Sequence, residues 1–123
     1  MSRTRNEVPA RFGSALDRLD GDVGLLREMA SITSEDLPEV RAATQRAIDD
    51  GDCEQAAAGL HKLKGMLSTF ESDGVTLEIQ EILDLARRGK IDEVQENYQQ
   101  QKAAIDELSD QVSELASAAN SSN

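Results

Sequence analysis

The stretch from Ala56 to Phe70 constrains the fold most strongly, because its apolar residues repeat with the period of a helix. Apolar side chains recur at three- and four-residue intervals at Leu60, Leu63, Leu67 and Phe70, which places them on one face of an α-helix. That face must be buried against other elements. The chain has two prolines and no alternating run of Val, Ile, Thr and aromatic residues between turns, which argues against a substantial sheet. The pattern predicts an all-α protein.

Length and composition suit one helical domain. A chain of 123 residues is long enough to bury one core, and we expect no second catalytic domain such as an ATP-binding module. Hydrophobic residues make up 38% and aromatic residues 2% of the chain. Aliphatic side chains must therefore fill the interior, as is typical of helix bundles.

Capping and turn signals divide the chain into five predicted helical segments, over residues 12–19, 23–50, 53–71, 75–88 and 91–115. Asp22 and Asp52 are predicted N-caps. A further capping signal at residues 33–36, followed by Pro38, means that the second segment either restarts there or runs through with a kink. Its first half has an apolar face formed by Val23, Leu26, Met29, Ala30 and Ile32.

These segments predict an antiparallel four-helix bundle with a short N-terminal lid helix, over residues 12–116. We expect residues 1–11 to be a flexible N-terminal arm and residues 117–123 a disordered tail. The last helix carries a heptad-like apolar stripe that reaches past the length of its expected partners. The chain is therefore expected to be a monomer, with a coiled-coil dimer through this last helix as the alternative.

His61 is the only histidine of the chain, and on a helix it lies off the apolar stripe. Its neighbours one and two turns away are small or cationic: Ala57, Ala58, Lys64, Gly65 and Ser68. We call His61 and these five residues the histidine face. A glycine inside a helix costs about 1 kcal/mol relative to alanine, and Gly65 is explained if another body must come close there. The arrangement indicates chemistry on an exposed imidazole that a partner approaches.

The residues around His61 carry a resemblance to a known family. His61-Lys62-Leu63-Lys64-Gly65 resembles the H-x-L-K-G signature of histidine-containing phosphotransfer (HPt) domains, the helical intermediates of two-component phosphorelays. The stretch from Arg18 to Asp22 is similar to the family's R-L-x-G-D motif, and the resemblance covers roughly residues 16–115. One position departs from the family pattern, because the glycine usual ten residues after the histidine is here Glu71. We therefore expect a reshaped loop after the histidine helix.

The resemblance implies a passive phosphorelay. His61 would accept a phosphoryl group from the phospho-aspartate of a receiver domain, in a response regulator or hybrid histidine kinase, and pass it to another receiver. Lys64 would offset the new charge. The receiver would dock on a surface made of Ala58, Lys62, Gly65, Met66 and Ser68, and two further residues are weaker candidates, namely Gln80 as a hydrogen-bond donor to the imidazole and Arg87 near the docking surface.

The resemblance also implies which protein, this chain or its partner, would supply the cofactors of the transfer. The chain would need no cofactor of its own, and the receiver would supply Mg²⁺. Further His or Cys ligands for zinc are missing beyond His61 and Cys53, and no Walker motif supports phosphorylation from ATP. We therefore expect a phosphoryl carrier without autokinase activity and without a metal site.

Charge limits the partners that the surface can bind. The net charge is −11, from 24 acidic and 13 basic side chains, so most of the surface repels nucleic acid and anionic lipid. No apolar run reaches the roughly 20 residues that span a bilayer. The single Cys53 cannot form an internal disulfide, which fits a reducing compartment. We expect a cytoplasmic protein that binds neither nucleic acid nor membranes.

Two hypotheses of different classes follow for the whole chain. Either His61 is a phosphoryl acceptor, or it is a surface histidine without a task, on a helical adaptor that dimerises through the last helix. An acceptor needs a free ring nitrogen, a nearby cation and no bulky cover. His61, Lys64 and Gly65 provide these together, and a neutral imidazole needs no dedicated base. The sequence favours phosphotransfer.

Overall fold

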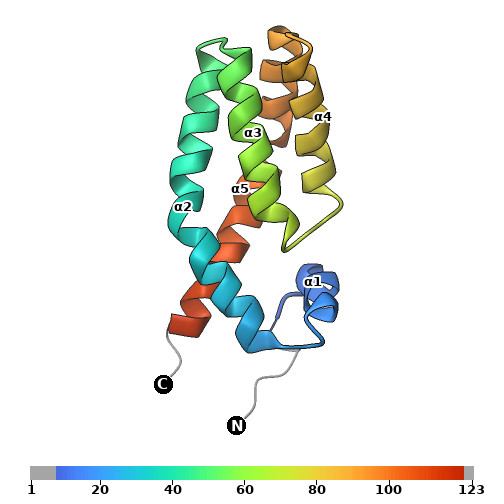
Figure 1. Cartoon of the computed structure of the whole chain (residues 1–123), viewed down its shortest axis with the longest axis vertical. Helices are drawn as coiled ribbons and strands as arrows, with labels where there is room; N and C mark the ends of the chain where they lie inside the picture. Colours follow the sequence, from blue (N-terminus) through green and yellow to red (C-terminus); the bar gives the residue numbers. More distant parts are fainter. Residues whose placement is uncertain (1–7, 121–123) are drawn as a thin grey trace.

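The chain is entirely helical over the part that its structure describes. A computed structural model describes residues 8–120, and the side chains of residues 8–117. This part holds no strand and consists of one short 3-10 helix followed by five α-helices (Figure 1): η2 (Ala10–Phe12), α1 (Gly13–Arg18), α2 (Val23–Asp49), α3 (Cys53–Ser68), α4 (Val75–Arg87) and α5 (Ile91–Asn120). The predicted helical class is confirmed.

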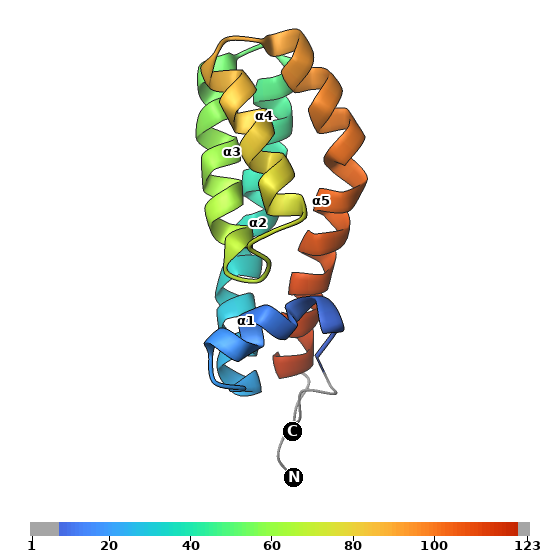
Figure 2. The ribbon, with the colours of Figure 1, turned by 90° about the vertical axis from the view of Figure 1, so that its right-hand side faces the viewer.

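The four long helices lie side by side as a bundle. α2 packs against both α3 and α5, and α4 packs against the same two helices from the other side. Figure 1 shows the α2–α3 and α4–α5 connections at one end of the molecule and the α3–α4 loop further towards the other. Figure 2 shows α1 lying across that second end, below the α3–α4 loop. The short first helix thus has the position expected of a lid.

α2 is a single helix despite the proline inside it. It runs without interruption from Val23 to Asp49 and contains Pro38, so of the two alternatives left by the sequence the continuous helix is observed. Proline has no N–H to donate to the carbonyl four residues earlier, which is a common cause of helix bending. The helix changes direction along its length (Figure 1).

Both predicted N-caps are formed. Asp22 accepts a hydrogen bond through its carboxylate from the backbone N–H of Leu25 at 3.0 Å, and Asp52 accepts one from Gln55 at 3.0 Å. Each bond satisfies one of the amide groups that a helix start leaves without a partner. Gly51, with φ of +74°, makes the turn between α2 and α3. These local signals fix where the histidine helix begins.

The core runs the length of the bundle and continues under the lid. The largest fully buried side chains include four from α3 and its end, namely Leu60, Leu63, Leu67 and Phe70, as the sequence predicts. Phe12 meets Phe70 edge to face, with ring centroids 6.2 Å apart. The guanidinium of Arg18 donates to the backbone carbonyl of Thr69 at 2.9 Å. The lid is therefore attached to the end of the histidine helix.

The sequence predicts a flexible arm at the N-terminus and a disordered tail at the C-terminus, and the structure describes part of each. Residues 1–7 lie outside the described part, but Val8 is buried and Arg11 contacts two other elements. Val8 and Arg11, near the end of the arm predicted over residues 1–11, therefore contact the rest of the chain. At the other end α5 continues to Asn120, into the predicted tail of residues 117–123, of which 121–123 are not described.

Glu71 stabilises the loop that follows the histidine helix. The guanidinium of Arg11 donates through Nε to Glu71 Oε2 at 3.0 Å and through Nη2 to Oε1 at 3.2 Å, and its Nη1 donates to Gln111 at 3.1 Å. Glu71 Oε1 also accepts from the N–H of Val75 at 3.4 Å, near the start of α4. One carboxylate thus ties the lead-in segment to the α3–α4 loop. A partly buried ion pair with two charge-assisted hydrogen bonds stabilises a fold more than an exposed ion pair does.

The apolar stripes of α2 and α5 differ from the prediction in which of their residues are buried. Ile32, expected on the buried face of α2, is 64% exposed, because the helix turns that position outwards. In α5, Val112 and Leu115 at the far end are buried within the chain, where α5 packs against α2, a helix of 27 residues beside its own 30. The apolar surface on which the predicted dimer contact depended is therefore already covered.

Gly59 allows α2 and α3 to approach closely. A Cβ placed on Gly59 would lie 2.3 Å from Thr44 Oγ1 and 3.2 Å from the Thr44 Cα. Thr44 is fully buried and donates its hydroxyl to the carbonyl of Val40 at 2.8 Å. The hydroxyl cannot move away without losing that bond. Gly65, in contrast, has no atom within 4 Å of such a Cβ.

We predict that the two glycines of α3 respond oppositely to alanine. Gly59→Ala should lower the free energy of unfolding by about 1 kcal/mol or more, because overpacking costs about 1–3 kcal/mol and outweighs the gain in helix propensity. Gly65→Ala should raise it by up to about 1 kcal/mol. Urea unfolding followed by far-UV circular dichroism measures both. Equal effects of the two substitutions would contradict the close approach at Gly59.

We also predict an acid-dependent contribution from the link between α2 and α5. Asp106 forms ion pairs with Arg41 and, at 3.0 Å, with Lys102. Partial burial by itself raises the pKa of Asp106, but hydrogen bonds from Lys102 and Arg41 outweigh it and hold the pKa below its usual value. A lowered pKa in the folded state stabilises the fold above the unfolded-state pKa, and this is lost as the pH falls through the folded-state pKa. The stability difference between the parent and Asp106→Asn should therefore shrink on acidification, as measured by urea unfolding at a series of pH values.

Candidate histidine site

His61 lies near the middle of α3 and is exposed. The opposite face of the helix holds Ala56, Leu60, Leu63 and Leu67, each fully buried. Burial of these four side chains fixes the rotation of the helix about its axis. The imidazole is therefore directed to solvent by the core rather than by any bond of its own.

The histidine face has little cover. Ala58 and Gly65, one turn before and after His61, are exposed, while Ala57 is half-buried. The half-buried Ser68 donates its hydroxyl to the backbone carbonyl of Lys64, so it lies down along its own helix. Open space surrounds the Cα of Gly65. A visiting protein surface can thus approach the imidazole without displacing a large side chain.

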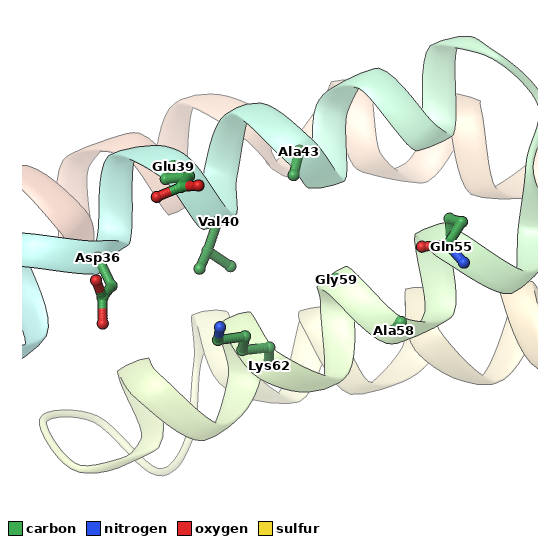
Figure 3. A pocket seen from close by; sticks show the side chains of 8 residues that line it. All are labelled: Asp36, Glu39, Val40, Ala43, Gln55, Ala58, Gly59 and Lys62. Atoms are coloured by element: carbon green, nitrogen blue, oxygen red, sulfur yellow. The ribbon is translucent and has the colours of Figure 1, made fainter.

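Two lysines provide positive charge beside the imidazole. Lys64, one turn ahead of His61, is half-buried, and Lys62 is exposed. Neither forms an ion pair with the described residues, whereas Arg11, Arg41 and Lys102 are each paired with a carboxylate. Lys62 extends from α3 towards α2 (Figure 3). Lys64 is therefore the better placed of the two to offset charge on His61.

Two of the predicted site residues, Met66 and Gln80, are directed away from the histidine face. Met66 is five residues beyond His61, about 140° around the helix, and it packs against the core. Gln80 donates its side-chain amide to Asp84, one turn along its own helix, at 2.9 Å, rather than to the imidazole. Arg87 is exposed in the last turn of α4. The i,i+4 acceptor at Asp84 explains why Gln80 turns away.

The surroundings of the histidine face include two hollows that the sequence analysis missed. One lies between the lid, α2 and α3, and it is lined by Ala15, Arg18, Leu19, Met29, Gly65, Ser68, Thr69 and Ser72. The other, which we call the α2–α3 groove, is lined by Asp36, Glu39, Val40, Ala43, Gln55, Ala58, Gly59 and Lys62 (Figure 3). Both include residues of the histidine face. The signal that could have found them is the run of Ala and Gly on facing helices.

The potential metal ligands among the described residues do not converge on one point. Among the described residues no three His, Cys, Asp or Glu side chains lie close enough together to hold a metal ion. Within the same part of the chain, no helix combines the length and apolar character needed to cross a membrane.

The described residues form a helical bundle that carries an exposed histidine on one of its long helices. Comparison with family models gives a match to the Hpt domain over residues 28–118, which includes the whole histidine helix. The chain belongs to the Hpt domain family, whose members have a phosphotransfer role in two-component signalling and interact with receiver domains. The stretch from Arg18 to Asp22, which also resembled the family, lies outside the matched span. Searches of curated proteins and of solved structures gave no match.

We predict that filling the open space at Gly65 slows phosphoryl transfer without harming the fold. Gly65→Leu should keep the far-UV helix signal, because no other side chain or element lies within 4 Å of a Cβ at that position and leucine is a good helix former. Transfer from a phosphorylated receiver should fall by about 10-fold or more, since displacement of the reacting groups by about 1 Å is costly. Ala103→Leu, which also introduces a leucine in place of a small residue but at an exposed position of α5, is the control. An unchanged rate would contradict the open-face argument.

Proposed function

We propose that this protein is a phosphorelay intermediate that accepts a phosphoryl group on His61 from the phospho-aspartate of one receiver and passes it to another. The observation that carries the proposal is the exposed His61 within the family match, on a helix face without bulky cover. An antiparallel four-helix bundle would serve as the rigid frame. Each receiver would belong to a response regulator or a hybrid histidine kinase.

The proposed step is an in-line displacement at phosphorus. The lone pair of one imidazole nitrogen of His61 forms the new P–N bond while the P–O bond to the receiver's aspartate breaks. The bonding electrons leave with the aspartate, which becomes a free carboxylate. In the second half of the relay, the carboxylate of another receiver attacks phosphorus and the P–N bond breaks, which restores the imidazole. Positioning and electrostatics are the main requirements of such a transfer.

The charge that His61 acquires would be offset by Lys64, and to a smaller extent by Lys62. Both lysines lack ion-pair partners among the described residues, so their charge is available. We assign Mg²⁺ and the catalytic carboxylates to the receiver, since the neighbours of His61 on α3 are small or cationic. The chain itself would need no cofactor, would lack autokinase activity and would act in the cytoplasm.

The adaptor hypothesis has less support. It depended on an uncovered apolar stripe at the end of α5, and in the structure Val112, Leu115 and Ala116 are buried within the chain. No comparable apolar stripe is exposed on the described part of α5. We therefore favour a monomer that works through the histidine face.

We predict that His61 is the position that carries the phosphoryl group. Mixing the chain with a panel of radiolabelled phospho-receivers should place on it a label that is labile in acid and stable in alkali, as expected of phosphohistidine. Because the chain has one histidine, such a label identifies the residue. His61→Gln should abolish it, with unfolding in urea as the control for an intact fold. The proposal would be contradicted if no receiver of a broad panel transferred label to the chain, or if His61→Gln retained the label.

A further inference from the structure

The α2–α3 groove is the feature of the molecule that the proposed function does not yet use. Its floor is apolar and formed by small or branched side chains on the two helices, with Val40 and Ala43 on α2 facing Ala58 and Gly59 on α3 (Figure 3). The small side chains of Ala43 and Ala58 leave the groove open beside the close approach of Gly59 to Thr44. Its floor can hold the aliphatic part of an incoming side chain.

The rim of the groove carries an excess of negative charge. Asp36 and Glu39 line it from α2, and Lys62 lines it from α3. Asp36 extends towards α3 and Lys62 towards α2 (Figure 3), but no ion pair forms between them, nor with any other described residue. Two exposed carboxylates thus face one ammonium group. An apolar floor beside unpaired carboxylates fits a long cationic side chain, which buries its stem and keeps its charged end at the rim.

The groove adjoins the histidine face. Ala58 belongs to both surfaces, and Lys62 is the residue next to His61. A partner that covers the imidazole therefore also covers the groove. The sequence-based docking surface lay on α3 alone, whereas the structure places α2 beside it.

An exposed apolar residue extends this surface along α2. Ile32, Asp36 and Glu39 are spaced by four and three residues and so share one face of the helix. Ile32 is 64% exposed, the highest value among the large hydrophobic side chains of the described residues. An exposed isoleucine beside a groove is a usual component of a protein interface. We call Ile32, Asp36 and Glu39 the α2 stripe.

We propose that the α2 stripe and the α2–α3 groove select receiver domains that present a Lys or Arg side chain beside an apolar contact on their docking face. This inference rests on the proposed function and adds to it a specificity determinant on α2. The cation would enter the groove and meet Asp36 and Glu39, and the apolar contact would cover Ile32. Complementary charges of this kind raise association rates and exclude wrong partners more than they add affinity.

The test uses the full chain and the receiver that transfers fastest to the parent in the panel described above. Asp36→Lys and Glu39→Lys should each slow transfer by about 10-fold at low salt, with a smaller effect at high salt, because screening weakens charge steering. Ile32→Ser should slow transfer with little salt dependence. Glu107→Lys, the same charge change at an exposed position of α5, is the matched control. Circular dichroism of each variant shows whether the fold is intact.

A compensating change in the receiver makes the test specific. Exposed Lys and Arg residues of the receiver are replaced by Glu one at a time. One such replacement should slow transfer to the parent and restore transfer to Asp36→Lys or Glu39→Lys. Phosphorylation of His61 by phosphoramidate, a small donor that needs no docking, should be equal in all variants. A loss that also occurs with phosphoramidate would place the defect at the imidazole and overturn the inference.

The remaining outcomes separate this inference from the proposed function. If the parent accepts label and the α2 variants match it at low salt, the inference is wrong while the phosphorelay function stands. If no receiver transfers to the parent, both fail. If analytical ultracentrifugation shows self-association of the parent that Asp36→Lys abolishes, the groove binds a second copy of the chain and the inference is also wrong.

Discussion

Burial of one face of α3 determines the direction in which His61 points. Leu60, Leu63 and Leu67 are fully buried, and each such side chain contributes roughly 1.5–3 kcal/mol through loss of apolar surface to water. No hydrogen bond holds the imidazole in place in the described structure, so the helix as a whole acts as its support. A phosphoryl acceptor benefits from this arrangement, because the ring is fixed in position by the core yet remains uncovered for a partner.

The lid completes this support at the end of α3. Phe12 packs on Phe70 edge to face. The guanidinium of Arg11 donates two hydrogen bonds to Glu71 and a third to Gln111. Glu71 is thus the residue through which the lead-in segment contacts the α3–α4 loop.

Charge is distributed unevenly around the site. The chain carries a net charge of −11, yet Lys62 and Lys64 stand beside His61 without carboxylate partners among the described residues. Two carboxylates on α2, those of Asp36 and Glu39, line the groove together with Lys62. In the proposed relay, a receiver would therefore meet positive charge beside His61 and negative charge on the neighbouring helix. Such a pattern can orient a partner as well as attract it.

The sequence by itself determined the helices, their caps and the exposure of His61, because these depend on local periodicity and on bonds between residues close in the chain. Asp22, Asp52 and the stripe from Leu60 to Phe70 are where the pattern placed them. Only the tertiary structure decided which neighbours share a surface. Gly59 lies against Thr44, Gln80 turns to Asp84, and Ile32 faces solvent beside the groove, since these depend on how helices distant in the sequence rotate and approach one another.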